Sequence, residues 1–310
     1  MTDQTNRNRP CKIGIFLPLI ENQGVHGVAS WRDILAVTQR AEELGYDSVW
    51  VPDHVIFRHP NQPETGVWEA MSMLAAIAAS TSRIELGPLV LAAGFRNPAL
   101  LAKMADTIDE ISGGRLILGL GAGWHKPEYD AFGFPFDHRY ARFEEAITII
   151  HGLLRDGHVD FEGVYHQARD CELRPRGPRP SGPPILIGTS GPKMLRLTAR
   201  YADMWNVDWR NSPADIPPFL ADLDAACREV GRDPKTLLRT VGVEVDMPGA
   251  ISNRAERSKG KRTPPMTGTP EEMAETIRAY AALDLQLLFD PNTVESLEAF
   301  APVLELLDRE

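Results

Sequence analysis

The sequence predicts an α/β fold in which eight parallel strands alternate with helices and close into a (β/α)8 TIM barrel. Short apolar runs alternate with amphipathic stretches along the whole chain. The runs carry almost no polar side chains, as expected of parallel strands that are buried on both faces. No break in composition divides the 310 residues. We therefore expect one barrel domain over 1–310 rather than a doubly wound open sheet.

The first half of the chain predicts four strand-helix units. Ser30 and Gly45 mark the two ends of the first helix, and Asn97-Pro98 opens the third. The expected strands are 13–17, 48–51, 83–86 and 116–120, and the expected helices are 31–44, 68–79, 97–111 and 140–154.

The second half predicts four more units and two insertions. A hairpin signal at Glu162-Gly163 and a proline-rich stretch after it make 156–184 an excursion from the barrel. The aperiodic stretch 247–268 is expected to be a mobile insertion. The remaining strands are expected at 185–187, 204–207, 237–245 and 285–289, and the helices at 193–201, 213–230, 269–283 and 294–307.

The composition narrows the class of protein. The 33 basic and 43 acidic residues give a net charge of −10, which argues against nucleic acid or an anionic membrane as the partner. Three widely spaced cysteines suggest neither a disulfide framework nor a thiolate metal site. The polar N-terminus and the short apolar runs indicate no membrane span. We expect a cytoplasmic protein that acts on a small molecule.

The usual motifs for metal and nucleophile chemistry are missing. The eight histidines are scattered, without His-Glu-x-x-His spacing. There is no Gly-x-Ser-x-Gly elbow either. A bound organic cofactor is therefore the expected carrier of the chemistry.

Asp53 and His54 follow the second predicted strand, where a barrel places its active site. The imidazole of His54 can exchange a proton near neutral pH, and Asp53 could fix its tautomer or bond to the backbone. The alternative is that Asp53 caps a turn and His54 is a satisfied loop histidine.

Two glycine-containing segments follow other strands. Gly121 and Gly123, before Trp124, would let another backbone or a flat ligand approach closely, or would only make a bend. The second segment joins a strand to a helix, so its backbone N–H groups could bind a phosphate or simply begin a capped helix. Its residues are Gly188, Thr189, Ser190, Gly191, Pro192 and Lys193.

Several segments, in order over most of the chain, resemble the bacterial-luciferase-like superfamily of flavin-dependent and deazaflavin-dependent oxidoreductases. Three of them read WEAMSMLAAIAASTSRIEL (68–86), ISGGRLILGLGAGWHKPEY (111–129) and PPILIGTSGPKMLRLTARYADMW (183–205), with NPALL (97–101) and 143–153 in addition. Within this superfamily the chain is most similar to the subgroup that uses coenzyme F420.

The resemblance implies roles for particular residues. The cofactor ring would lie across the barrel mouth against Leu89 and Val90, which stand where the family has a non-proline cis peptide. The cofactor phosphate would bind at 188–193, and the segment from Gly121 to Trp124 would face the cofactor. His54 would handle a proton, and Asp53 would contact the polar edge of the ring.

Trp124 departs from the family pattern. The deazaflavin sugar-phosphate dehydrogenases carry a glutamate acid at this position, so the second acid or base is unassigned and Glu128 and His125 are candidates. Within 247–268, basic residues including Arg254 and Lys261 could meet an acidic cofactor tail or an anionic substrate, or be a solvated loop.

The function implied is hydride transfer between coenzyme F420 and a small organic substrate. One alternative is an FMNH2-dependent monooxygenase that uses O2 through a flavin hydroperoxide, and another is a non-catalytic flavin-binding barrel. The resemblance also implies a homodimer.

Overall fold

A computed structural model describes residues 9–21, 27–249, 263–290 and 293–309. Within them, nine strands form one sheet in the order β5-β2-β1-β13-β12-β11-β10-β7-β6, and every neighbouring pair is parallel. The strands are β1 (Ile13–Phe16), β2 (Ser48–Val51), β5 (Glu85–Pro88), β6 (Leu91–Ala92), β7 (Leu118–Gly121), β10 (Ile185–Gly188), β11 (Met204–Trp209), β12 (Leu238–Val243) and β13 (Leu285–Phe289).

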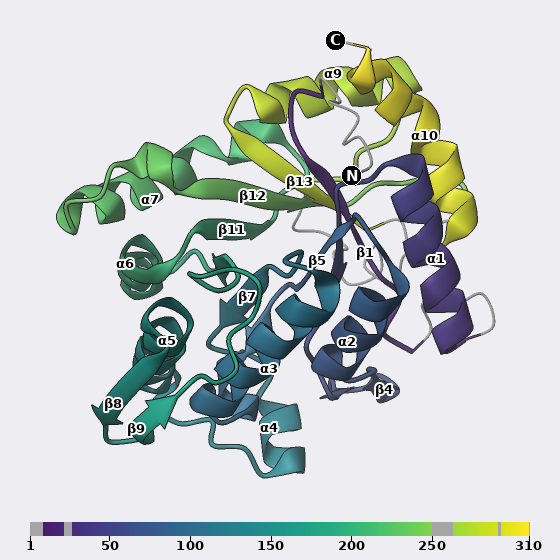
Figure 1. The fold of residues 1–310 in the computed structure, drawn as a ribbon. Helices are drawn as coiled ribbons and strands as arrows, with labels where there is room; N and C mark the ends of the chain where they lie inside the picture. The colour runs from purple at the N-terminus through teal and green to yellow at the C-terminus, as the bar shows by residue number, and fades with distance from the viewer. Residues whose placement is uncertain (1–8, 22–26, 250–262, 291–292, 310) are drawn as a thin grey trace.

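The two ends of the sheet meet, which makes it a barrel. Leu86 of β5 forms a parallel bridge with Leu116, and the Ile117 N–H donates to the Leu86 carbonyl at 2.8 Å. The predicted (β/α)8 TIM barrel is therefore confirmed (Figure 1). The third predicted strand, 83–86, is formed as two pieces, β5 and β6, separated by Leu89 and Val90.

Helices surround the sheet on its outer side (Figure 1). The predicted caps are present: Ser30 forms a capping box with Asp33, and Thr269 forms one with Glu272. The helices are α1 (Trp31–Leu44), α2 (Ala70–Ser80), α3 (Pro98–Ser112), α4 (Lys126–Phe132), α5 (Arg139–Asp156), α6 (Pro192–Tyr201), α7 (Pro217–Glu229), α9 (Pro270–Ala281) and α10 (Val294–Asp308), with short 3-10 turns η1 (Ala93–Phe95), η2 (Pro213–Asp215) and η3 (Pro234–Thr236).

Two small antiparallel pairs lie outside the barrel sheet. In the predicted excursion, β8 (His158–Glu162) pairs with β9 (Gln167–Glu172), and the turn lies at 163–166. The sequence pattern did not predict α4, nor the pair of β3 (Ile56–Phe57) and β4 (Thr65–Gly66). Residues 250–262 of the predicted insertion, with Arg254 and Lys261, lie outside the described residues.

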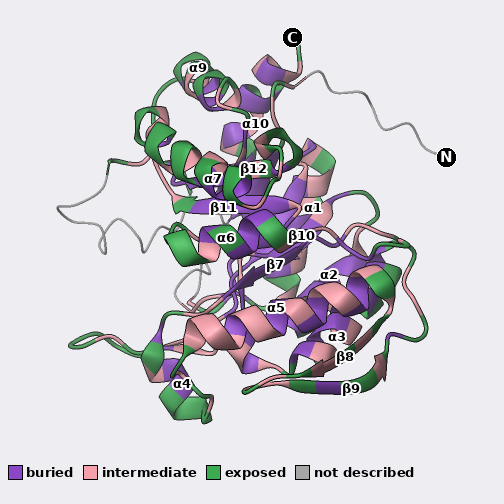
Figure 2. Cartoon of the chain, turned by 90° about the vertical axis from the view of Figure 1, so that its left-hand side faces the viewer, coloured by how far each residue is buried: buried purple, intermediate pink, exposed green. Residues whose placement is uncertain are grey.

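The barrel interior is filled by large side chains. Trp50 is 1% exposed and occupies the space beside Gly14 and Gly87, where an added Cβ would lie 2.6 Å and 2.9 Å from its ring. A larger apolar cluster packs between the strands and the helices, so the buried residues follow the sheet and the inner helix faces (Figure 2). The interior cluster consists of Phe16, Trp50, Ile117, Leu186, Met204 and Leu288.

Arg9, the first described residue, is linked to the last helix. Its guanidinium contacts Asp47 at 3.1 Å and Asp308 at 2.8 Å, and the Arg9 side chain is only 4% exposed. The first described residue is thereby fixed to the last helix. Over the described residues, no helix combines the length and the apolar character needed to span a membrane.

Candidate functional site

The residues predicted for the site lie at neighbouring strand ends. Asp53 and His54 follow β2, Leu89 and Val90 join β5 to β6, and Trp124 comes shortly after β7. Residues 188–193 join β10 to α6. These strands are adjacent in the barrel, so the four segments lie along one arc of its C-terminal mouth.

The peptide bond between Leu89 and Val90 is cis, as the resemblance implies. The Val90 side chain lies against two glycines of the neighbouring strands: an added Cβ would be 2.7 Å from it at Gly121 and 3.0 Å from it at Gly188. At Gly119 a Cβ would lie 2.0 Å from the Pro88 carbonyl. These glycines therefore admit the protein's own strand end, which is one of the two alternatives that the sequence left open.

Gly123 serves the turn that carries Trp124. Its φ is +74°, and a Cβ there would be 1.8 Å from the Tyr129 hydroxyl. The Arg139 guanidinium donates to the Gly123 carbonyl at 2.6 Å. The position requires glycine, and the turn is fixed from outside by Arg139.

Glu128 of α4 contacts His54 directly. The distance from His54 Nδ1 to Glu128 Oε1 is 2.9 Å, and the Val55 N–H donates to Glu128 Oε2 at 3.0 Å. The Glu128 side chain is 1% exposed and the His54 side chain 17%. A carboxylate at Nδ1 favours the tautomer with its proton on that nitrogen, which leaves Nε2 able to accept a proton.

Asp53 has other partners. It accepts two hydrogen bonds from Arg96, both at 2.8 Å, and one from the Ala92 N–H at 2.8 Å. Arg96 also contacts Glu69, the N-cap of α2, at 2.5 Å. The sequence left two roles open for Asp53, fixing the His54 tautomer and bonding to the backbone. The structure shows the bond to the backbone. Glu128 rather than Asp53 orients the His54 ring.

This ion network changes the pKa values of Arg96 and Glu69. Burial by itself would lower the pKa of Arg96, but the hydrogen bonds and charges of Asp53 and Glu69 outweigh it and raise that pKa. Burial by itself would raise the pKa of Glu69, but hydrogen bonds from Ser72, Arg96 and the helix backbone lower it to about 2. Arg96 and Glu69 therefore carry charge at neutral pH.

Aromatic rings surround His54. Its ring centroid lies 4.2 Å from Phe57 and 5.6 Å from Trp124, and Trp124 lies 5.0 Å from His125. His125 Nε2 accepts a hydrogen bond from the Arg58 N–H at 3.0 Å. Glu128 and His125 therefore attach the segment that contains β3 to the segment that follows β7.

Residues 188–193 form an exposed turn into α6. Gly191 is the N-cap, and it has no side-chain cap bond. The Thr189 hydroxyl accepts from the Gly191 N–H at 3.2 Å, and a Cβ on Gly191 would meet no atom within 4 Å. Lys193 Nζ lies 5.7 Å from the Tyr140 ring. The structure thus shows no conventional side-chain cap, and the space beside the helix start is open.

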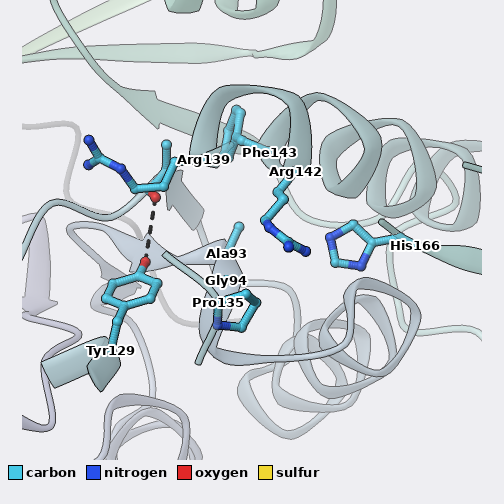
Figure 3. Close-up of a pocket in the computed structure, with 9 residues that line it drawn as sticks. Ala93, Gly94, Tyr129, Pro135, Arg139, Arg142, Phe143 and His166 are labelled. Carbon is cyan, nitrogen blue, oxygen red and sulfur yellow. Dashed lines mark hydrogen bonds between the residues drawn. The ribbon is translucent and has the colours of Figure 1, made fainter. Parts of the chain in front are cut away.

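A pocket that the sequence did not predict lies behind the mouth (Figure 3). It is a small hollow, partly open to solvent, between η1, α4, α5 and His166. The Arg142 guanidinium is engaged by Asp137 at 3.0 Å and lies 4.4 Å from the Tyr165 ring. Burial, with a contribution from Arg142, lowers the pKa of His166. The Arg142 guanidinium is therefore paired with a carboxylate, and burial favours the neutral form of His166.

Comparison with known proteins gives matches over most of the chain. A family model described as luciferase-like monooxygenase matches residues 11–247. Pyrimidine monooxygenase RutA of Enterobacter cloacae is 28% identical over 322 residues, covering 96% of this chain and 87% of that protein. An F420-dependent glucose-6-phosphate dehydrogenase of Amycolatopsis mediterranei is 36% identical over 177 residues, covering 56% of this chain and 52% of that protein.

Solved structures share the fold. An F420-dependent secondary alcohol dehydrogenase in complex with an F420-acetone adduct has a TM-score of 0.78 at 20% identity, covering 96% of this chain and 99% of that chain. Monooxygenase RslO1 of Streptomyces bottropensis has a TM-score of 0.75 at 22% identity, covering 96% and 98%. With the family match over residues 11–247, we conclude that the chain is an oxidoreductase enzyme of the luciferase-like monooxygenase family.

Proposed function

We propose that this enzyme transfers a hydride between coenzyme F420 and a small organic substrate at the barrel mouth, with His54 as the proton donor or acceptor. The observation that carries the proposal is the His54–Glu128 pair at 2.9 Å, beside the Leu89-Val90 strand end. Relatives that use F420 are found both by sequence and by structure.

The residues at the mouth fit such a cofactor. Leu89 and Val90 are partly buried and pack on the barrel core, and so offer an apolar wall for a flat ring. The open helix start at Gly191, with Lys193 behind it, suits a phosphate because its N–H groups and the helix dipole favour an anion. Gly121 and Gly123 would complete the cofactor-facing edge. When bound, the deazaflavin would accept the hydride in substrate oxidation and supply it in substrate reduction.

The protein's own part is to move and stabilise a proton. In substrate oxidation, His54 Nε2 takes the proton from the substrate hydroxyl, and in reduction it returns that proton to the carbonyl oxygen. Glu128 stabilises the imidazolium that forms, because its buried carboxylate lies at the opposite ring nitrogen. Asp53 holds the Ala92 end of the strand that follows Val90.

A second candidate is a monooxygenase that uses FMNH2 and O2. The observation in its favour is the similarity to pyrimidine monooxygenase RutA, which extends over 96% of the chain. In this case the same wall and helix start would hold FMN, and His54 would serve as the proton donor near the oxygenated substrate. We also propose that the enzyme works as a homodimer, which light scattering on the purified protein tests directly.

Titration of the apoprotein with F420 and with FMN, followed by absorbance and tryptophan quenching, tests the choice of cofactor. We expect F420 to bind more tightly and to support turnover without O2. His54→Ala is expected to lower turnover by roughly 10²-fold to 10⁴-fold while F420 still binds. Productive oxidation of reduced flavin only with O2, without F420 binding, would establish the monooxygenase. Unchanged turnover in His54→Ala, with binding retained, would contradict catalysis by His54 and favour a binding barrel.

A further inference from the structure

We propose that Trp124 is the stacking surface for the substrate, and that the substrate is a planar, uncharged ring. This inference rests on the proposed function, because it places the substrate beside His54. It differs from the expectation that Trp124 faces the cofactor, and it assigns a class of substrate to the site.

The first argument is the exposure of Trp124. The residue is 59% exposed, although it lies among other rings. It meets His54 edge-on, with 5.6 Å between centroids and 78° between planes, and Phe57 lies 6.4 Å away. An indole with this much exposed surface does not fill a core, and its flat face suits another flat ring.

The second argument is that the Trp124 backbone is fixed on both sides. Before it, Arg139 donates to the Gly123 carbonyl at 2.6 Å. After it, His125 Nε2 accepts from the Arg58 N–H at 3.0 Å, and His125 is 4% exposed. The backbone that carries the indole is therefore fixed beside the imidazole. A surface fixed in advance loses little conformational entropy when a ligand binds.

The third argument concerns charge. Three charged side chains of the segments around Trp124 are paired: Arg58 with Glu64 at 2.9 Å, Lys126 with Asp130 at 2.5 Å, and Glu128 with His54. An anionic substrate placed on Trp124 would gain little from cations that already have a carboxylate partner. The affinity of a neutral ring is not reduced by the pairing of these side chains, because stacking depends on the ring face.

Two probe molecules test the inference on F420-loaded protein: 2-pyridone, which is planar, and 2-piperidone, its saturated counterpart with the same lactam group. Binding is measured by ligand-observed NMR titration. We expect wild-type protein to prefer the planar probe by roughly threefold to tenfold. Trp124→Leu should remove this preference, and Trp124→Phe should retain most of it. A carboxylated 2-pyridone should bind no more tightly than 2-pyridone.

Phe132→Leu is the matched control, because Phe132 is 55% exposed on α4, the helix that follows Trp124, and stacks on Phe134 instead of His54. It should leave the preference unchanged. The inference is overturned if wild-type protein binds neither probe, if Trp124→Leu keeps the preference, or if the carboxylated probe binds best. It is also overturned if Trp124→Leu weakens F420 binding and leaves the preference intact. These readouts need no turnover, so they are separate from the His54→Ala test of the function.

Discussion

The Glu128 carboxylate makes two contacts with different effects. One carboxylate oxygen contacts His54 Nδ1 and the other accepts from the Val55 N–H. The carboxylate therefore sets the orientation of the ring and also fixes the backbone directly after it. In the proposed function its effect on the reaction is transmitted through His54, so we propose Glu128 as a positioning residue.

Glu128→Gln tests this role. The amide keeps one oxygen acceptor but removes the charge, so the imidazolium loses a charge-assisted hydrogen bond worth about 1.5–3 kcal/mol. We expect turnover to fall by about 10-fold to 100-fold, with a smaller effect on F420 affinity and a changed pH profile of turnover. Asp130→Asn, on the same helix but paired at the surface with Lys126, is the control and should match wild type. Unchanged turnover in Glu128→Gln would refute the positioning role.

Glu69 gives the protein a pH dependence of stability. Its folded pKa of about 2 lies below its ordinary value of 4.5. A depressed carboxylate pKa contributes stability that is present above 4.5 and lost as the pH falls toward 2. The midpoint temperature of thermal unfolding should therefore decrease as the pH is lowered from 4.5 toward 2. This decrease should be smaller in Glu69→Gln. Glu229→Gln, which removes a surface partner of Arg196, should follow the wild-type curve. Parallel curves for Glu69→Gln and wild type would contradict the assignment.

At the scale of residues, the sequence predicted which residues belong to the candidate site. It predicted less well which of these residues contact one another. Asp53 is adjacent to His54 in the chain, yet its carboxylate points to Arg96 and Ala92. Glu128 is 74 residues away and makes the contact. Partners of this kind depend on how two loops meet in space, which residue spacing along one chain does not encode. Arg96 was missed for the same reason.

At the scale of elements, β7 illustrates how one strand shapes its neighbour. Its glycines leave room for the Pro88 carbonyl and for Val90. They therefore set the position of the Leu89-Val90 wall. Strand 116–120 and its glycine exit could be predicted because the apolar run is uninterrupted. The reason for the glycines could not, since it lies in another strand.

Gly121→Ala is expected to destabilise the protein by about 1–3 kcal/mol, the usual cost of overpacking. The added Cβ would lie 2.7 Å from Val90 Cγ2. Val90→Ala in the same chain should restore part of that loss, because it removes the clashing methyl group. Urea denaturation measures both effects. Gly191→Ala, where a Cβ meets no atom within 4 Å, is the control for stability. A double variant no more stable than Gly121→Ala would show that the clash lies elsewhere.

Helix α4 (Lys126–Phe132) shows the limit of periodicity. It has 7 residues, too few to display a full hydrophobic repeat. The loop signals of Gly133 and Pro135 follow it directly and dominated the prediction. The long helices were predicted well because several turns and a cap agree, as at Ser30 and Thr269.

At the scale of the whole molecule, the barrel could be predicted because each strand is a separate apolar run with a helix after it. What the pattern could not show is how the sheet closes. Closure depends on a bridge between Leu86 and Leu116 and on a strand split at Leu89 and Val90. Nor could the pattern show that Arg9, the first described residue, contacts Asp308 on the last helix.

Arg9→Met should lower the free energy of unfolding by about 1–3 kcal/mol. The substitution leaves Asp47 and Asp308 without the guanidinium that now contacts both. Urea denaturation followed by circular dichroism measures the change. Arg40→Met is the matched control, because Arg40 also links an early helix to α10 through Glu298, but at an exposed site. Equal stability of Arg9→Met and wild type would show that the Arg9 ion pairs do not stabilise the fold.

Two hydrogen bonds limit how this site can evolve: the Val55 N–H donates to Glu128, and the Arg58 N–H donates to His125. The segment after β2 and the segment after β7 are encoded far apart, yet each is shaped by the other. A change of substrate range through one of them alone would disturb the proton-transfer residue as well. Chimeras between family members should therefore exchange residues 54–66 and 123–128 at the same time, because neither segment keeps its shape without the other.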